Sequence, residues 1–217
     1  MLKKLFCIFS LSSVLTMPVS AVVLTGNFVF DTGNTGIIYS EDFETGLVNW
    51  TKINDGRGDI LHSNSALSGS GSAVLMAMSS FSGAGYALQS ENISVDVNAE
   101  YILSGYINTA NMTTGQAYID LSDASFEPNL GAEELSKSLN DWQFVYTQFT
   151  PTTDNIQIRL VNDGNVIAGE SVLFDLIKVT KASDFIAPPN LSEVPVPAAA
   201  WLFISGLLGI MGMKRKL

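Results

Sequence analysis

Polar and aromatic side chains on three predicted strands have the types that carbohydrate recognition uses. Because side chains on a β-strand alternate between its two faces, residues two apart share a face. The three strands are predicted over residues 101–108, 117–121 and 156–161. If they share a sheet, its outer face presents Tyr106, Tyr118, Asp120, Gln157 and Arg159. Aromatic rings stack on the apolar faces of sugars and planar polar groups bind hydroxyls, so this set predicts a glycan site. The alternative is an ordinary solvated sheet face with cross-strand pairs.

Three acidic residues lie within or beside apolar segments, where a carboxylate is costly. Asp42 and Glu44 flank Phe43, and Asp175 interrupts the apolar run 173–177. A half-buried carboxylate needs an ion pair or a metal ion to offset its lost hydration. A metal site is one interpretation, and carboxylates at strand ends in water are the other.

Catalytic residues are poorly supported. His62 is the only histidine, and the sequence gives it no Ser, Cys or acidic partner. A glycosidase needs two carboxylates held a few ångströms apart, but with 21 acidic residues any pair could be nominated. The sequence has no Gly-x-Ser-x-Gly elbow and no phosphate-binding loop. We therefore predict a protein that is not an enzyme, with a polysaccharide hydrolase as a remote alternative.

The segment between the chain ends is predicted to be all-β, as a jelly-roll-like antiparallel β-sandwich. Short alternating or apolar runs recur along it, separated by turns rich in Gly, Asn and Asp. The predicted strands cover residues 22–30, 37–43, 73–78, 86–90, 101–108, 117–121, 142–149, 156–161 and 172–179. Trp50 and Trp142 each follow a polar turn and open into a strand, so we expect both indoles in the core.

Several short motifs, in this order, resemble family 4/9/22-type carbohydrate-binding jelly rolls. They are Asp42-Phe43-Glu44 followed by Gly46 and Trp50, the glycine turn 68–71, the strand 101–107, Asp141-Trp142, and the strand around Asp175. The resemblance implies a jelly-roll fold and carbohydrate binding. It also implies a structural calcium ion where the first and last strands meet, with Asp42, Glu44 and Asp175 as ligands. Carbonyl oxygens of the turn 68–71 would help to complete a shell of about six to eight oxygens.

The charge of this segment excludes several partners. Residues 22–193 contain six basic residues against all 21 acidic ones, a formal charge of −15. Such a field repels nucleic acid and anionic membrane surfaces. Nucleic acid is therefore excluded as a partner, whereas cations and neutral partners are compatible with this charge.

The N-terminus is typical of a secretory signal peptide. Lys3-Lys4 form a basic region, residues 5–15 are apolar, and Val19-Ser20-Ala21 is a small-residue cleavage site. Cleavage after Ala21 removes Cys7, the only cysteine, so we expect an exported protein without disulfides.

The last 24 residues are typical of a sorting tail. The motif Val194-Pro195-Val196-Pro197 holds the backbone extended, and the apolar run 198–213 predicts one transmembrane helix of roughly 24 Å. Lys214, Arg215 and Lys216 form a basic end that stays cytoplasmic. This arrangement closely resembles the PEP-CTERM sorting signal of Gram-negative bacteria, with Val196 in place of the name-giving Glu. The resemblance implies transient anchoring in the inner membrane and cleavage by an exosortase-type enzyme. The processed protein then goes to the cell surface or extracellular matrix. The alternative is an ordinary C-terminal anchor.

Four segments result: a signal peptide (1–21), a β-sandwich (22–187), a linker (188–193) and the sorting tail (194–217). We predict a non-catalytic surface or matrix protein whose sandwich binds exopolysaccharide or a surface glycan. The alternative is a structural matrix or envelope protein without glycan binding.

Overall fold

The computed structural model of the chain describes residues 22–25, 33–53, 56, 58–82, 85–121 and 135–186. Val22–Thr25 and Asn34–Phe185 fall in one compact unit, whereas Gly33 and Ile186 belong to a second. The predicted signal peptide, linker and sorting tail lie outside the described residues, and so do the motif Val194, Pro195, Val196, Pro197 and the basic end Lys214, Arg215, Lys216. In the described part of the chain, no helix is long and apolar enough to cross a membrane.

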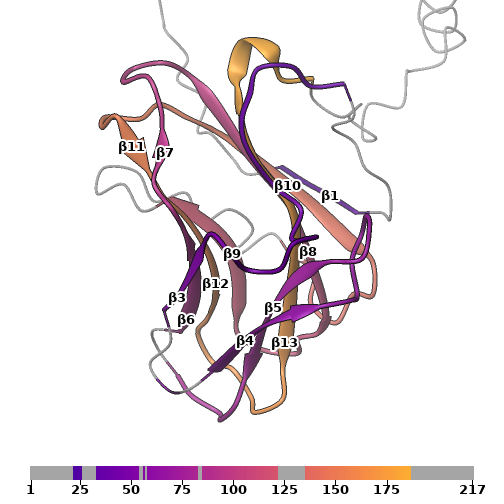
Figure 1. The fold of residues 1–217 in the computed structure, drawn as a ribbon. Helices are drawn as coiled ribbons and strands as arrows, with labels where there is room; N and C mark the ends of the chain where they lie inside the picture. Colours follow the sequence, from indigo (N-terminus) through magenta and orange to yellow (C-terminus); the bar gives the residue numbers. More distant parts are fainter. Residues whose placement is uncertain are drawn as a thin grey trace, which may run out of the picture. The chain divides into compact units, whose positions relative to one another are not determined.

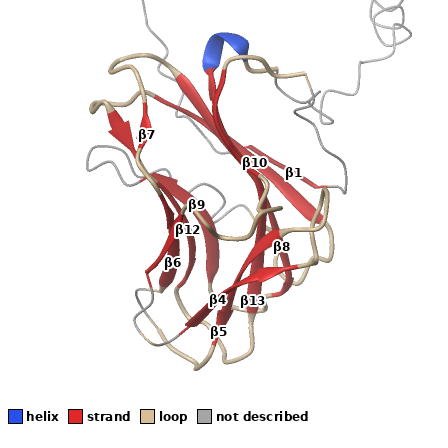
Figure 2. Ribbon diagram, viewed as in Figure 1, coloured by secondary structure: helices blue, strands red, loops and turns tan. Residues whose placement is uncertain are grey.

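The described residues form two main antiparallel sheets and one small pair of strands (Figure 1). The larger sheet has the strand order β1-β10-β8-β13-β5-β4, with β2 also paired to β13. The smaller sheet has the order β3-β6-β12-β9, and β7 pairs with β11. Within the described ranges, the 3-10 turn η1 (Ala182–Asp184) is the one helical element (Figure 2).

The strand bounds are β1 Val22–Thr25, β2 Ile37–Glu41, β3 Trp50–Ile53, β4 Gly58–Ser63, β5 Ser72–Ala77, β6 Tyr86–Ser90 and β7 Ile93–Ser94, then β8 Tyr101–Asn111, β9 Gln116–Leu121, β10 Trp142–Phe149, β11 Asn155–Ile156, β12 Ile158–Asp163 and β13 Ser171–Lys181. The predicted all-β antiparallel fold is confirmed. Three strands fall outside the predicted ranges: β3 is exposed at three of its four positions, β4 lacks clean alternation, and β7 has only two residues.

The core lies between the two sheets and is filled by alternating side chains from strands of both sheets. Leu103 and Ile107 of β8, and Ile158 and Leu160 of β12, are fully or almost fully buried. Each such side chain contributes about 1.5–3 kcal/mol on burial. Trp50 and Trp142 are 7 % and 5 % exposed, so the prediction that they are buried is confirmed.

Strand β13 carries a bulge at a junction of the larger sheet. Its first half pairs with β5 and its second half with β2, and the register shifts between Asp175 and Lys178. Leu176, inside the shift, has a left-handed backbone with φ of 50°. A bulge re-aims side chains and ends regular pairing. Asp175 therefore lies at the point along β13 where pairing with β5 ends and pairing with β2 begins.

Candidate functional site

Four of the five residues predicted to bind glycan lie on or beside the outer face of the four-stranded sheet. Leu160 and Ile119 point into the core, so their neighbours along β12 and β9 point outward. Two cross-strand rows form this face. In strand order β3-β6-β12-β9, they contain Thr51, Gln89, Arg159 and Asp120, and then Ile53, Ala87, Val161 and Tyr118.

An ion pair joins the first row across two strands. The Arg159 guanidinium donates from Nη2 to Oδ2 of Asp120, which lies opposite it in the ladder. The Asp120 side chain is 4 % exposed and that of Arg159 is 33 % exposed. When a buried carboxylate binds a planar guanidinium, it fixes the direction in which the N–H groups of the guanidinium point. Arg159 is therefore held at the surface in one orientation.

Tyr118 flanks this ion pair in the second row. Its hydroxyl donates to Oδ2 of Asp163, at 3.2 Å, from the end of β12. Burial, together with the Asp163 carboxylate, raises the pKa of Tyr118, so the phenol stays protonated and keeps this bond. Tyr118 is half-buried.

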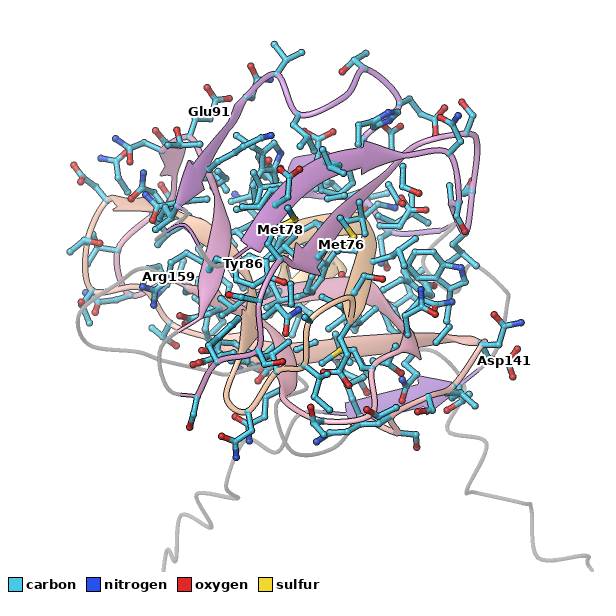
Figure 3. The ribbon with its side chains drawn as sticks, turned by 90° about the horizontal axis from the view of Figure 1, so that it is seen from below. Met76, Met78, Tyr86, Glu91, Asp141 and Arg159 are labelled. Atoms are coloured by element: carbon cyan, nitrogen blue, oxygen red, sulfur yellow. The ribbon has the colours of Figure 1, made fainter. Side chains whose placement is uncertain are left out.

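These side chains enclose a hollow of about 200 Å³. Its polar lining comes from Tyr118, Asp120, Arg159 and Asp163, and the rest of the lining is Ile53, Gly85, Tyr86, Ala87 and Val161. In Figure 3, Arg159, Tyr86 and Met76 follow one another from left to right, from the outer face of this sheet toward the larger sheet. An apolar floor edged by directed polar groups suits a small ligand that has an apolar face and several hydroxyls.

Gln157 lies just before β12, two residues from Arg159. Its Oε1 accepts a hydrogen bond from Nε2 of Gln89, at 3.0 Å, and Gln89 stands next to Arg159 in the first row. Gln157 therefore borders the face, and the expectation that it shares a surface with Arg159 agrees with the structure.

The prediction that Tyr106 shares this face is wrong. Tyr106 lies on β8, which belongs to the larger sheet, and its side chain is fully buried. It packs on Phe144 of β10, with ring centroids 4.8 Å apart. The alternation correctly places Tyr106 opposite Ile107, but residues 101–109 of β8 are all buried, so both faces of this strand are covered.

The structure brings two of the three expected calcium ligands to one turn. Asp175 is fully buried, and its Oδ2 accepts N–H bonds from Leu67 and Ser68, at 2.8 and 3.2 Å. Glu44 accepts N–H bonds from Ser70 and Gly71, at 2.7 and 2.8 Å. These carboxylates therefore converge on the turn 67–71.

Asp42 is directed elsewhere. Its Oδ1 accepts the N–H of Glu44, at 3.2 Å, and the residue is exposed. Among the described residues, no group of three or more His, Cys, Asp or Glu side chains could hold a metal ion. The turn thus meets two of the three expected carboxylates, which accept its N–H groups, and calcium stays a prediction.

Sequence reasoning missed Asp163 and the apolar floor. The Asn-Asp-Gly-Asn motif at 162–165 predicts a turn and ends the predicted strand at Val161. β12 instead continues to Asp163, which places Arg159, Val161 and Asp163 on one face at two-residue spacing. That spacing is the signal that could have found Asp163.

Neither a protein-family model nor a curated protein sequence matches the chain. Solved structures do match. One is the C-terminal family 22 carbohydrate-binding module of Clostridium thermocellum Xyn10B, at 17 % identity and a TM-score of 0.52, covering 72 % of this chain and 99 % of the module. The chain shares the jelly-roll fold of this module.

Two further matches contain the same kind of module in longer chains. The tandem family 22 modules of Paenibacillus barcinonensis Xyn10C match at 18 % identity and a TM-score of 0.50, covering 74 % of this chain and 49 % of theirs. A Clostridium thermocellum xylanase fragment, a family 22 module with its GH10 module, matches at 14 % identity and a TM-score of 0.51, covering 71 % of this chain and 30 % of the fragment.

Proposed function

We propose that the protein is a non-catalytic carbohydrate-binding protein that holds glycan on the outer face of its four-stranded sheet. The observation that carries this proposal is the convergence of Tyr118, Asp120 and Arg159 on one hollow with an apolar floor. The fold shared with carbohydrate-binding modules supports it.

Each side chain has a distinct part in binding. The Tyr118 ring offers an apolar face for a sugar ring, and Arg159 offers N–H donors for hydroxyl oxygens. Asp120 acts through Arg159 as a positioning residue, because it fixes the direction of the guanidinium. Asp163 fixes the Tyr118 hydroxyl in the same way. The two acids of the hollow are thus engaged by neighbouring donors, which suits binding better than hydrolysis.

Binding to a polysaccharide panel tests the proposal. The purified protein is run in affinity gels containing xylan, cellulose derivatives, β-1,4-galactan or the exopolysaccharide of its own cells. We expect Tyr118→Ala to weaken retention about tenfold, equivalent to about 1.4 kcal/mol, because the stacking surface is lost. The matched variant Tyr118→Phe keeps the ring and loses only the bond to Asp163, so it should keep most of the retention. Retention by no polysaccharide would favour the structural matrix protein.

We further propose that residues 194–217 sort the protein as an exosortase substrate, supported by the proline motif, apolar run and basic end of the sequence. Pro195→Ala together with Pro197→Ala should leave an uncleaved form in the inner-membrane fraction. The unaltered chain should give a shorter, released or surface-attached form on immunoblots. An unaltered chain that stays full-length in the membrane would instead indicate an ordinary anchor.

We also propose a structural calcium ion at the turn 67–71, held by Glu44 and Asp175 with backbone carbonyls. Burial, and then the nearby Glu44 charge, raise the pKa of Asp175 to about 6, even though three N–H bonds act in the opposite direction. Two carboxylates at one partly buried turn are a stable arrangement when a cation offsets their charge.

A further inference from the structure

A second hollow continues the same surface beyond Tyr118. Its volume is about 320 Å³, and its lining is Gly115, Gln116, Lys137, Gly164 and Asn165. Gln116 lies opposite Asp163 in the ladder of β9 and β12, and Asp163 lines the first hollow. The two hollows therefore meet at the pair Gln116–Asp163.

The spacing of the two hollows follows from the strand that joins them. Gln116 and Tyr118 are two residues apart on β9 and share its outer face. At about 3.3 Å per residue, their Cα atoms are roughly 7 Å apart along the strand. This distance is short enough for two adjacent sugar units of one polysaccharide molecule to contact both residues.

The wall that carries Lys137 is anchored on both sides. The carbonyl oxygen of Ser136 accepts hydrogen bonds from Thr109 Oγ1, at 2.6 Å, and from Gln143 Nε2, at 2.9 Å. The Ser138 hydroxyl donates to the carbonyl of Met112, at 2.7 Å. Ser138 itself has a left-handed backbone with φ of 55°, a conformation that the surrounding bonds must hold. Lys137 is thus presented from a fixed turn, which lowers the entropy cost of a contact with it.

The other walls are two glycine turns in contact with each other. Gly115 and Gly164 both have left-handed backbones, with φ of 66° and 83°. A Cβ atom at Gly115 would meet the carbonyl oxygen of Asp163 and Val166 Cγ2, both at 2.9 Å. A side chain at this position would press on the turn 163–166, so the glycine allows the two turns to lie close together.

The chemistry of the second hollow differs from that of the first. Its lining offers the amides of Gln116 and Asn165 and the ammonium of Lys137, and the described lining has no aromatic ring. Amides both donate and accept, and an ammonium donates, so these groups suit hydroxyls without stacking. A sugar ring can stack only in the first hollow, on the ring of Tyr118.

We infer that the surface binds an internal stretch of a linear glycan, with one unit stacked on Tyr118 and a following unit in the second hollow. This inference rests on the proposed function. The ligand class is therefore a polysaccharide chain, bound along its length, and a single sugar or a chain end would use only part of the surface.

The test measures affinity against chain length by calorimetry. The purified protein is titrated with cello-, xylo- and β-1,4-galacto-oligosaccharides of increasing length. We expect affinity to rise about tenfold or more from the shortest ligands and to level off once both hollows are filled. Gln116→Ala combined with Lys137→Ala should reduce the long ligands to the affinity of the short ones. Ser183→Ala, on η1 and away from both hollows, is the matched surface control.

The outcomes separate the inference from the proposed function. Binding that depends on Tyr118 but not on chain length would overturn the inference and keep the function. An equal loss of affinity for short and long ligands in the double variant would also overturn the inference. Binding of no ligand at any length, by a folded protein, would overturn the proposed function and the inference with it.

Discussion

Glu170 is a buried carboxylate whose removal should destabilise the fold in a pH-dependent way. It is 6 % exposed and accepts bonds from the N–H groups of Thr113, Thr114 and Ile167, at 2.6, 2.9 and 3.0 Å. The hydroxyls of Thr113 and Thr114 also donate to it. Burial alone raises the pKa of Glu170, but these donors outweigh burial and lower it to about 2.

The size of the effect follows from this pKa. Lowering the pKa of Glu170 from its ordinary value of 4.5 to about 2 corresponds to roughly 3 kcal/mol of stability at neutral pH. Because the folded-state pKa is lowered, this contribution is present above about pH 4.5 and is lost as the pH falls toward 2. Glu170→Gln keeps the shape but replaces one acceptor oxygen with a donor. We expect it to cost roughly 3 kcal/mol at pH 7.

Urea unfolding followed by the fluorescence of the buried tryptophans measures this loss at pH 7, 5 and 3. In thermal unfolding, the same loss lowers Tm by roughly 6–12 °C, at about 2–4 °C per kcal/mol for a domain of this size. The difference between the two proteins should shrink steadily below pH 5. Glu100→Gln, at an exposed position, is the control and should change little. A difference that stays constant from pH 7 to pH 3, or stays below 1 kcal/mol throughout, would show that the ionised Glu170 does not stabilise the fold in this way.

Three further predictions concern the larger sheet, the site and the turn. Tyr106→Ala should cost about 3–5 kcal/mol in unfolding experiments, because it empties a packed position, and a stable variant with weakened glycan binding would contradict this. Gly85→Ala should cost about 1–3 kcal/mol, because a Cβ there would overlap the carbonyl oxygen of Asn162, and a variant of unchanged stability would show that β12 can shift. Calcium at a hundred times its Kd should stabilise the fold by about 2.7 kcal/mol, and chelator should reverse this gain. The gain should be absent in Asp175→Ala, and no response of Tm to either reagent would remove calcium from the account.

The sequence predicted most strands because alternation survives wherever one face of a strand packs on the core. Residues 86–90 and 142–149 were predicted with the bounds that β6 and β10 have. β3 carried no such signal, since Thr51, Lys52 and Ile53 are all exposed. Its place in the sheet depends on pairing with β6, a contact between residues far apart in the sequence.

The candidate site was partly predictable for the same reason. Alternation correctly put Tyr118, Asp120 and Arg159 outward, but it could not say which sheet each strand joins. Tyr106 was misplaced because β8 pairs with β10 and β13 instead of with β9. The second hollow needed three loops brought together by tertiary structure, and no local pattern marks it.

Chemical-shift mapping of the labelled protein with a bound oligosaccharide tests most directly where glycan binds. We expect the shifts to be concentrated on the outer face of β9 and β12, at Tyr118, Asp120, Arg159 and Asp163. Shifts centred on the larger sheet around Tyr106 and Phe144, with the β9–β12 face unchanged, would contradict it.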